Sequence, residues 1–317
     1  MAKVIAVCIS EEKGTQKHYV NGAKLVPNHG IENDAHAGKW HRQVSLLNFE
    51  KIEDFRAKGV NVDYGAFGEN IVIDEIDFRN LPIGTRFQIG DALLELTQIG
   101  KECHSHCAIY HAVGDCIMPR EGVFTEVIKG GDIKVGDNVK VIEADPKRPL
   151  TASVITVSDK GSRGEREDES GPIIVDMLKE YGYDVKETMV IPDEKMLIEK
   201  QLARLADQRK INLILTTGGT GFARRDVTPE ATKAVCEKMA EGVAEAIRAN
   251  SMQYTSRAML SRATSGIRKE SLIVNLPGSP KAVKESLSFL LDNVKHGLDI
   301  LRGTASECAR KEGRNEN

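Results

Sequence analysis

A glycine-rich turn followed by charged residues is the part of this chain best suited to chemistry. It reads Leu213-Ile-Leu-Thr-Thr-Gly-Gly-Thr-Gly-Phe-Ala-Arg-Arg-Asp-Val-Thr-Pro-Glu-Ala231. Glycine lets a backbone turn sharply and approach a ligand closely. A loop of successive backbone amides just before a helix suits a phosphate or another anion. Together with Arg224, Arg225 and Asp226, the turn indicates a ligand-binding loop rather than a purely structural one.

Carboxylates near this loop could hold a metal ion. Asp193 and Asp226 are the candidates for Mg²⁺, which prefers carboxylate oxygens and water. Asp193 could equally cap the helix that follows it, and both interpretations stay open. Asp226 has Thr228 nearby to cap its helix, so a functional role is favoured for it.

Four basic residues could clamp an anionic ligand, although each taken alone is more typical of a solvated surface charge. They are Arg225, Arg248, Arg262 and Lys281.

The elements that position these residues alternate between strand and helix. Strands are expected at 152–157, 184–191, 211–215 and 272–276. Ser170 is expected to cap a helix that has Pro172 in its first turn, a long helix should start at Thr228-Pro229, and a final helix should follow Pro277-Gly-Ser-Pro280. Such alternation predicts an α/β domain whose mostly parallel sheet is covered by helices and binds ligands at the carboxyl ends of its strands. The residues after the strands would then form one site: Ser158 and Asp159, Asp193, the glycine loop with Asp226, and Asn275 to Ser279.

The first half has a different pattern. Short apolar runs broken by Gly, Asn and Asp predict strands, and hence a mainly β barrel or sandwich, with one helix near 48–57. The expected strands are 3–9, 43–47, 70–73, 86–89, 92–98 and 139–142. The proline-flanked segment 145–149 is the expected domain boundary.

Composition excludes several classes of protein. The formal charge of −3 is unlike that of a nucleic-acid binder, and no run approaches the length of a membrane span. Six cysteines in 317 residues do not resemble a secreted disulfide framework, so we expect a cytoplasmic protein.

Cysteines and histidines gather in residues 101–116, Lys-Glu-Cys-His-Ser-His-Cys-Ala-Ile-Tyr-His-Ala-Val-Gly-Asp-Cys. Cys103 and Cys107 have a zinc-ligand spacing, but no second such pair follows. A reactive thiol at Cys103 is favoured, since histidines nearby would stabilise the thiolate. Cys8, Cys116 and Cys236 are interpreted as buried structural cysteines.

The second half closely resembles the molybdopterin adenylyltransferases of the MogA/MoaB-like family. The matching motifs are Ile191-Pro-Asp-Glu194, Thr217-Gly-Gly-Thr-Gly221, Arg225-Asp-Val-Thr-Pro-Glu230, Ser261-Arg262 and Asn275-Leu-Pro-Gly-Ser-Pro-Lys281. The resemblance implies a homotrimer that uses Mg²⁺ and ATP to adenylylate molybdopterin, with Asp193 and Asp226 as essential catalytic and metal-binding residues. The sequence departs from the family pattern at one place, where Glu241-Gly242 stands instead of Pro-Gly ahead of Glu245 and Arg248. This departure leaves open the geometry of the loop at Glu241-Gly242. The strand ends and the resemblance together give these substrate- and nucleotide-binding candidates: Ser158, Asp159, Thr217, Gly218, Gly219, Thr220, Gly221, Arg225, Glu245, Arg248, Ser261, Arg262, Pro277, Gly278 and Ser279.

The first half resembles the MOSC domain found at the C-terminus of molybdenum cofactor sulfurases. The resemblance rests on Asp34-Ala-His-Ala-Gly38, Arg42-Gln-Val-Ser-Leu46, Gly68-Glu-Asn70 and Cys103. It implies a β-barrel that binds the molybdenum cofactor or carries sulfur, with Cys103 as acceptor or ligand. His36 and Glu69 are either functional or structural, with function slightly favoured.

Both resemblances lead to molybdenum cofactor biosynthesis. The expected organisation is a MOSC domain over 1–145, a linker over 146–150, an adenylyltransferase domain over 151–305 and a tail over 306–317. The alternative is a non-catalytic carrier that delivers molybdopterin or the molybdenum cofactor. Expected protein partners are molybdenum-insertion proteins or molybdoenzymes, and neither nucleic acid nor membrane is expected as a partner. The sequence leaves open the choice between molybdenum and tungsten and whether the two domains exchange product.

Overall fold

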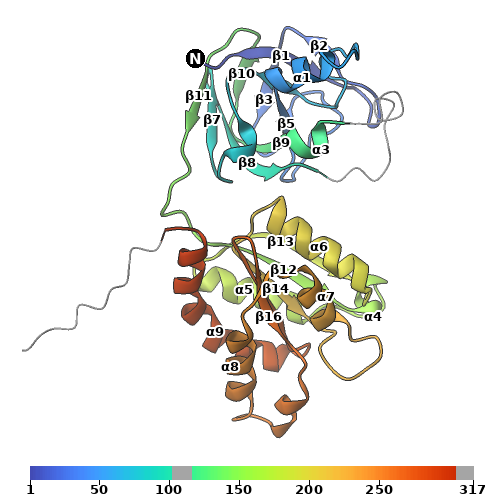
Figure 1. Cartoon of the computed structure of the whole chain (residues 1–317), viewed down its shortest axis with the longest axis vertical. Coiled ribbons are helices and arrows are strands. Elements are labelled where there is room, and N and C mark those ends of the chain that lie inside the picture. Colours follow the sequence, from blue (N-terminus) through green and yellow to red (C-terminus); the bar gives the residue numbers. More distant parts are fainter. Residues whose placement is uncertain (102–115, 305–317) are drawn as a thin grey trace, which may run out of the picture. The chain divides into compact units, whose positions relative to one another are not determined.

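A computed structural model describes residues 1–101 and 116–304 of the chain (Figure 1). The chain divides into two compact units, Met1–Pro146 and Lys147–Asn317. Each unit has its own hydrophobic core, as expected for a chain of this length.

The first unit is built mainly from strands, which confirms the predicted fold class. An eight-stranded sheet has the order β11-β7-β8-β9-β5-β6-β1-β2, and a three-stranded sheet has the order β10-β3-β4. The strands are β1 (Val4–Ile9), β2 (His18–Val20), β3 (Gly22–Val26), β4 (Gly30–Ile31), β5 (Val44–Asn48), β6 (Ile71–Ile73), β7 (Arg86–Ile89), β8 (Ala92–Ile99), β9 (Val123–Lys129), β10 (Gly131–Lys134) and β11 (Val139–Ile142). Among the described residues of this unit, the helices are α1 (Phe49–Arg56), the 3₁₀ helix η1 (Phe78–Asn80) and α3 (Met118–Glu121).

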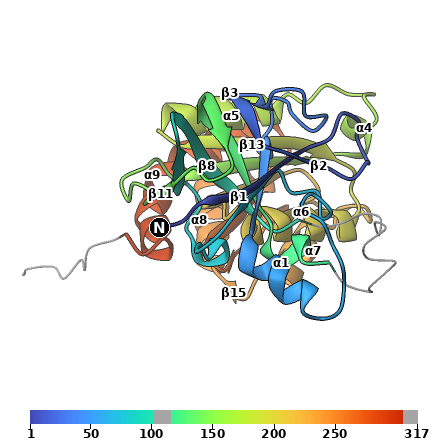
Figure 2. The same cartoon turned by 90° about the horizontal axis from the view of Figure 1, so that it is seen from above.

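The large sheet curls back on itself. The N–H group of Val4 donates to the carbonyl of Asp137 at 2.9 Å, and the N–H group of Val139 donates to the carbonyl of Ala2 at 2.8 Å. These bonds tie β1 to the start of β11, two strands that are six places apart in the sheet order. Figure 2 looks down on this unit and shows β1 crossing it from the N-terminus.

The second unit is the predicted mostly parallel sheet covered by helices. Its order is β13-β12-β14-β17-β16-β15. The first four strands are parallel to one another, β16 is antiparallel to β17, and β15 is antiparallel to β16. The strands are β12 (Thr151–Val157), β13 (Asp184–Ile191), β14 (Leu213–Thr217), β15 (Lys238–Met239), β16 (Ser265–Arg268) and β17 (Ser271–Leu276).

Two separate apolar cores cover the two faces of this sheet (Figure 1). The helices α5 (Ser170–Glu180), α8 (Glu241–Ser251) and α9 (Pro280–Leu301) pack on one face, through side chains such as Leu178, Ile247 and Leu287. The helices α6 (Lys195–Asp207) and α7 (Thr228–Val235) pack on the other, through Leu202 and Ala231. This helix-on-both-faces arrangement leaves the carboxyl edge of the parallel strands open for a site.

The prediction of a long helix from Thr228-Pro229 is wrong. Helix α7 has 8 residues and ends at Val235. Beyond it the chain becomes extended, because the N–H group of Glu237 donates to the carbonyl of Ile267 at 2.8 Å and β15 pairs with β16. Strand β16 was not predicted, and its hairpin with β17 provides the partner that stops the helix.

Candidate functional site

The four parallel strands bring the expected polar residues to one edge. Within the parallel ladder, Val157 lies opposite Ile191, and Thr217 lies opposite Leu276. The residues that follow each strand end therefore face one another across the edge. These are the segment beginning at Ser158, the segment around Asp193, the glycine loop and the segment beginning at Pro277.

Two glycines of the loop have backbone conformations that side chains rarely adopt. Gly218 has φ +95° and Gly219 has φ +63°. A Cβ atom on Gly219 would lie 2.3 Å from Oγ1 of Thr228 and 3.1 Å from Oδ1 of Asp193. A Cβ atom on Gly218 would lie 2.3 Å from the carbonyl oxygen of Val157. The absence of side chains therefore lets the loop pack directly against the strand β12 and against an acidic residue of the site.

Asp159 and Asp193 are joined by reciprocal hydrogen bonds. The N–H group of Asp159 donates to Oδ2 of Asp193 at 2.9 Å, and the N–H group of Asp193 donates to Oδ1 of Asp159 at 3.1 Å. Asp193 is not the cap of α6, because Glu194 occupies the N-cap position and its side chain makes no capping bond. The carboxylate of Asp193 is instead directed to the site edge.

The charges at this edge are unevenly compensated. Arg225 donates to both carboxylate oxygens of Asp159, at 3.0 and 2.8 Å, and to Glu194 at 2.9 Å. The hydrogen bonds from Arg225 lower the pKa of Asp159. Burial raises the pKa of Asp193, and the nearby carboxylates of Asp159 and Asp226 raise it further. Asp193 is thus a carboxylate whose negative charge would be stabilised by an added cation.

Asp226 lies beside Gly221, the last glycine of the loop. Its Oδ2 accepts the N–H group of Ala223 at 2.9 Å, and it would lie 2.9 Å from a Cβ atom on Gly221. The predicted cap of α7 is wrong in detail, because Thr228 is the first helical residue and its hydroxyl donates to the carbonyl of Gly218 at 3.0 Å. Thr228 therefore stabilises the loop rather than the helix end.

Two cavities flank the glycine loop and share Gly218, Gly219, Asp226 and Gly278. The first has a volume of about 260 Å³ and is strongly charged. It is lined by Asp193 and by the helix-start segment Arg166–Ser170. The second, of about 410 Å³, has both apolar and cationic walls, which include Leu260, Arg248 and Arg257. A ligand bound across the loop could place a phosphate-bearing part in one cavity and a ring in the other.

Most predicted residues line these cavities. The residues that line at least one of them are Ser158, Asp193, Thr217, Gly218, Gly219, Thr220, Gly221, Asp226, Arg248, Ser261, Pro277 and Gly278. Asp159, Arg225, Glu245, Arg262 and Ser279 are not among the lining residues. Glu245 is exposed on α8, and Ser279 caps α9 by accepting the N–H group of Ala282 at 3.3 Å.

Arg262 is a clamp on the glycine loop. Its Nε donates to the carbonyl of Gly221 at 2.6 Å, its Nη2 donates to the carbonyl of Asp226 at 2.5 Å, and its Nη1 pairs with Glu230. The planar guanidinium is thus committed to the protein itself and holds both ends of the loop. Arg262 therefore fixes the backbone at Asp226, while the Asp226 carboxylate is held by the N–H group of Ala223.

Several lining residues were missed from the sequence. Ser170, predicted as a helix cap, instead donates its hydroxyl to the carbonyl of Gly278 at 3.0 Å, and Glu169 occupies the cap position. Asp168 accepts the hydroxyl of Thr156 at 2.7 Å and the N–H group of Gly171 at 2.9 Å. The charged run before Pro172 was the available signal, because it lies between β12 and α5, at the carboxyl edge of the sheet where ligands bind in such folds.

The first unit has a buried polar network of its own. Glu69 is fully buried, and its carboxylate accepts the N–H groups of Gly65 at 2.7 Å and Phe67 at 3.0 Å. The side chain therefore stabilises the turn that precedes it. Cys8 and Cys116 are buried, as predicted, while Cys236 is half-buried. Cys103, Cys107 and the histidines between residues 102 and 115 lie outside the described residues. Within the described ranges, no three His, Cys, Asp or Glu side chains gather closely enough to hold a metal ion by themselves.

The fold and the site define a class first: an α/β domain with a glycine loop and two cavities at the carboxyl edge of its parallel strands. A family model described as "Probable molybdopterin binding domain" matches residues 153–296, and a model described as "MOSC domain" matches residues 33–140. No helix within the described part of the chain is long and apolar enough to cross a membrane.

Curated relatives match the second half. The molybdopterin adenylyltransferase of Helicobacter pylori strain J99 is 42% identical over 160 residues, which cover 50% of this chain and 91% of that protein. The enzyme of the same name from Escherichia coli K12 is 41% identical over 156 residues, covering 47% of this chain and 80% of that protein. A solved structure, the molybdopterin biosynthesis enzyme MoaB from Thermus thermophilus, is 42% identical, with a TM-score of 0.47, and covers 49% of this chain and 97% of that one.

The chain therefore belongs to the MogA/MoaB-like molybdopterin adenylyltransferase family, with a MOSC domain in its N-terminal half.

Proposed function

We propose that the C-terminal unit catalyses adenylyl transfer from Mg-ATP to molybdopterin, as a step in molybdenum cofactor biosynthesis. An oxygen of the pterin's terminal phosphate attacks the α-phosphorus of ATP, the bond between the α- and β-phosphates breaks, and pyrophosphate leaves. Such a transfer needs phosphates held in line and their charge neutralised, with little covalent chemistry from the protein. The relatives described above are molybdopterin adenylyltransferases, which supports this reaction.

The observation that carries the proposal is that Asp193 and Asp226 line the same charged cavity beside the glycine loop, and that Asp226 also lines the second cavity. Mg²⁺ is usually held by one or two carboxylates together with substrate phosphates and water. Two carboxylates at this edge fit that pattern, and the raised pKa of Asp193 indicates a site that gains from a cation. When bound, Mg²⁺ would neutralise phosphate charge during the transfer.

The other residues have distinct roles in this proposal. Each residue from Thr217 to Gly221 lines at least one of the two cavities, and the backbone amides of this loop would contact phosphate. Arg248 lines the larger cavity, donates to the carbonyl of Ala263 at 2.5 Å, and supplies positive charge to a bound anion. Arg225 would bind substrate by exchanging its contacts with Asp159 and Glu194 for phosphate oxygens. Arg262 acts as a positioning residue.

The remaining roles extend the proposal to the whole chain. The MOSC domain, over 1–145, binds the cofactor or carries its sulfur, with Cys103 as the proposed thiol. The adenylyltransferase domain, over 151–305, forms a homotrimer. The protein acts in the cytoplasm and passes its product to molybdenum-insertion proteins or molybdoenzymes.

The test is pyrophosphate release from Mg-ATP with and without molybdopterin. We expect release that depends on the pterin and is lost in Asp226→Asn. The asparagine side chain is neutral, so it lacks the negative charge with which the carboxylate of Asp226 would bind a metal ion. Asp176→Asn is the matched control, since Asp176 is an exposed carboxylate on α5 of the same unit. Tight pterin binding without pyrophosphate would instead identify a carrier. Absence of pterin binding in the wild-type protein would refute the proposal.

A further inference from the structure

The second cavity beside the glycine loop contains a buried hydroxyl that lacks a partner. Ser251, the last residue of α8, lines this cavity and is 7% exposed. Within the described ranges its Oγ atom makes no hydrogen bond. A hydroxyl that has lost its hydration without gaining a partner is unfavourable, and such groups are rare in native proteins. The hydroxyl of Ser251 is therefore available to a molecule bound in the cavity.

The same cavity contains a carboxylate that is only loosely paired. Glu285, near the start of α9, is 16% exposed, and its carboxylate lies 3.9 Å from Nζ of Lys281, which is longer than a hydrogen bond. Lys281 is 86% exposed, so water screens its charge. Asn250 donates to the backbone carbonyl of Glu285 at 3.4 Å and so joins the end of α8 to the start of α9. The hydroxyl and the carboxylate thus come from adjoining helices on one face of the sheet (Figure 1).

The rest of the cavity suits a flat ring. Its apolar walls include Ile247, Leu260 and Pro277. Its volume of about 410 Å³ is typical of small-molecule sites, in which apolar walls surround a few polar groups that fix the orientation of the ligand. Gly218 and Gly219 line both this cavity and the charged one. A ring bound here can therefore extend its phosphate towards the glycine loop.

The two polar groups distinguish one kind of ring from another. A carboxylate only accepts hydrogen bonds, and its two oxygens match two N–H donors that lie side by side. The 2-amino-4-oxo edge of a pterin ring has this pattern, because a ring N–H group lies next to the amino group. Adenine has an amino group next to a ring nitrogen with a lone pair, which a carboxylate would repel. The carboxylate of Glu285 therefore favours the pterin ring over the adenine of ATP.

We propose that Glu285 and Ser251 select the substrate ring in the second cavity. The carboxylate accepts from the ring N–H and amino groups of the 2-amino-4-oxo edge, and the hydroxyl of Ser251 bonds to another polar atom of the ring. The inference rests on the proposed function, since it takes molybdopterin as the substrate, and it adds the residues that read the ring. Guanine has the same edge, so a guanine nucleotide is the other source of this chemistry.

The experiment measures binding to the full chain by isothermal titration calorimetry, without ATP or Mg²⁺. The probes are pterin, guanosine, adenosine and lumazine, which is the pterin ring with a carbonyl in place of the amino group. We expect pterin to bind about tenfold more tightly than lumazine, because the carboxylate would lose one donor and meet an oxygen instead. Glu285→Gln should weaken pterin binding by about tenfold and abolish this preference. Asp292→Asn is the matched control, because Asp292 is a 71% exposed carboxylate on the same helix.

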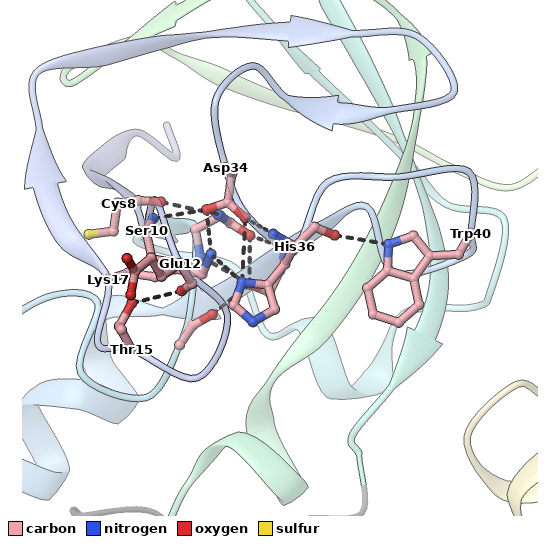
Figure 3. Close-up of polar contacts among 11 residues, drawn as sticks. Cys8, Ser10, Glu12, Thr15, Lys17, Asp34, His36 and Trp40 are labelled. Atoms are coloured by element: carbon pink, nitrogen blue, oxygen red, sulfur yellow. Dashed lines mark hydrogen bonds and ion pairs between the residues drawn. The ribbon is translucent and has the colours of Figure 1, made fainter.

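Ser251→Ala separates recognition from folding. It should weaken pterin binding by about threefold or more, as expected for the loss of one neutral hydrogen bond. The urea midpoint of the C-terminal unit should stay unchanged or rise, because the hydroxyl has no partner to lose. Trp40, the single tryptophan, donates its indole N–H group to the carbonyl of His36 at 3.1 Å in the first unit (Figure 3). Its emission therefore checks that each variant leaves that unit intact.

The outcomes separate the two sources of the ring and the two proposals. Tighter binding of pterin than of guanosine identifies the pterin, and the reverse identifies a guanine nucleotide. The inference is overturned if pterin does not bind, if it binds no more tightly than lumazine or adenosine, or if Glu285→Gln binds it as the wild type does. Pterin bound only by the MOSC domain would give this last result. Adenylyl transfer, followed separately as pyrophosphate release, can fail while pterin binding that depends on Glu285 remains, so the two failures are distinct.

Discussion

Replacing Gly219 by alanine should damage both the stability and the site of the C-terminal unit. Gly219 has φ +63°, a region that costs an alanine about 1–2 kcal/mol. Its Cβ would also lie 2.3 Å from Oγ1 of Thr228, which cannot move without breaking its bond to the carbonyl of Gly218. Overpacking of this kind costs about 1–3 kcal/mol. We therefore expect a total loss of about 2–5 kcal/mol in the free energy of unfolding.

Two further glycines separate the contributions. Gly182 has φ +81° but open space around its Cβ position, so Gly182→Ala should show the conformational cost alone. Gly278 has its nearest atom at 3.5 Å and no positive φ, so Gly278→Ala should change stability little. The measurement is urea unfolding of the full chain, analysed for the transition of the C-terminal unit, together with pyrophosphate release. If Gly219→Ala matches Gly182→Ala in stability and the wild type in activity, the close packing of the loop on Thr228 and Asp193 has been misread.

Three further outcomes follow from the charges and hydrogen bonds. Burial raises the pKa of Glu69 from 4.5 to about 7, so between these pH values the folded first unit holds a proton that the unfolded chain releases. The free energy of unfolding of this unit should therefore fall as pH rises between these values, by at most about 1.4 kcal/mol per pH unit. Glu69→Gln should flatten this dependence in denaturant titrations, and an unchanged slope would contradict it. Arg262→Lys should lose the forked contacts to the loop and raise the KM for ATP, whereas Arg224→Lys at an exposed position should not; equal KM values would argue against the clamp. Removal of Mg²⁺ by chelation should stop pyrophosphate release. Burial raises the pKa of Asp193, so protons should compete with the metal ion for this carboxylate, and the apparent Mg²⁺ affinity should weaken as pH falls. A pH-independent affinity would count against Asp193 as a ligand.

The sequence predicted the parallel strands and the glycine loop well, because both depend on local patterns. Apolar runs between turn residues mark strands such as β12 and β13, and the strand-end rule then gathers distant polar residues at one edge. The same reasoning missed β16, whose four residues Ser265–Arg268 are too short and too mixed to show a period. The resulting error, a long helix from Thr228, shows that helix ends depend on pairing partners elsewhere in the chain.

The roles of individual polar side chains were harder to predict, because each depends on its partners in space. Ser170 has the residue type of a helix cap, yet its hydroxyl binds the carbonyl of Gly278, 108 positions away in the sequence. Arg262 has the positive charge suited to binding an anionic ligand, yet two of its N–H groups donate to backbone carbonyls of the protein itself. The assignments of catalytic residues remain predictions for the experiments above, and the domain boundaries likewise remain predictions.

The alignment of β12 with β13 has a consequence for how this chain tolerates change. Val157 pairs with Ile191, and Asp159 and Asp193 each stand two positions beyond their strand, so the spacing between these carboxylates is set by strand register. Lengthening the exposed connection around Gly164 should therefore leave the two aspartates in place. Removing one residue from within β13 would reverse every side chain beyond the deletion and separate them. The pairing of the two strands therefore sets the distance between the Asp159 and Asp193 carboxylates, and insertions engineered into the connections should leave that distance unchanged.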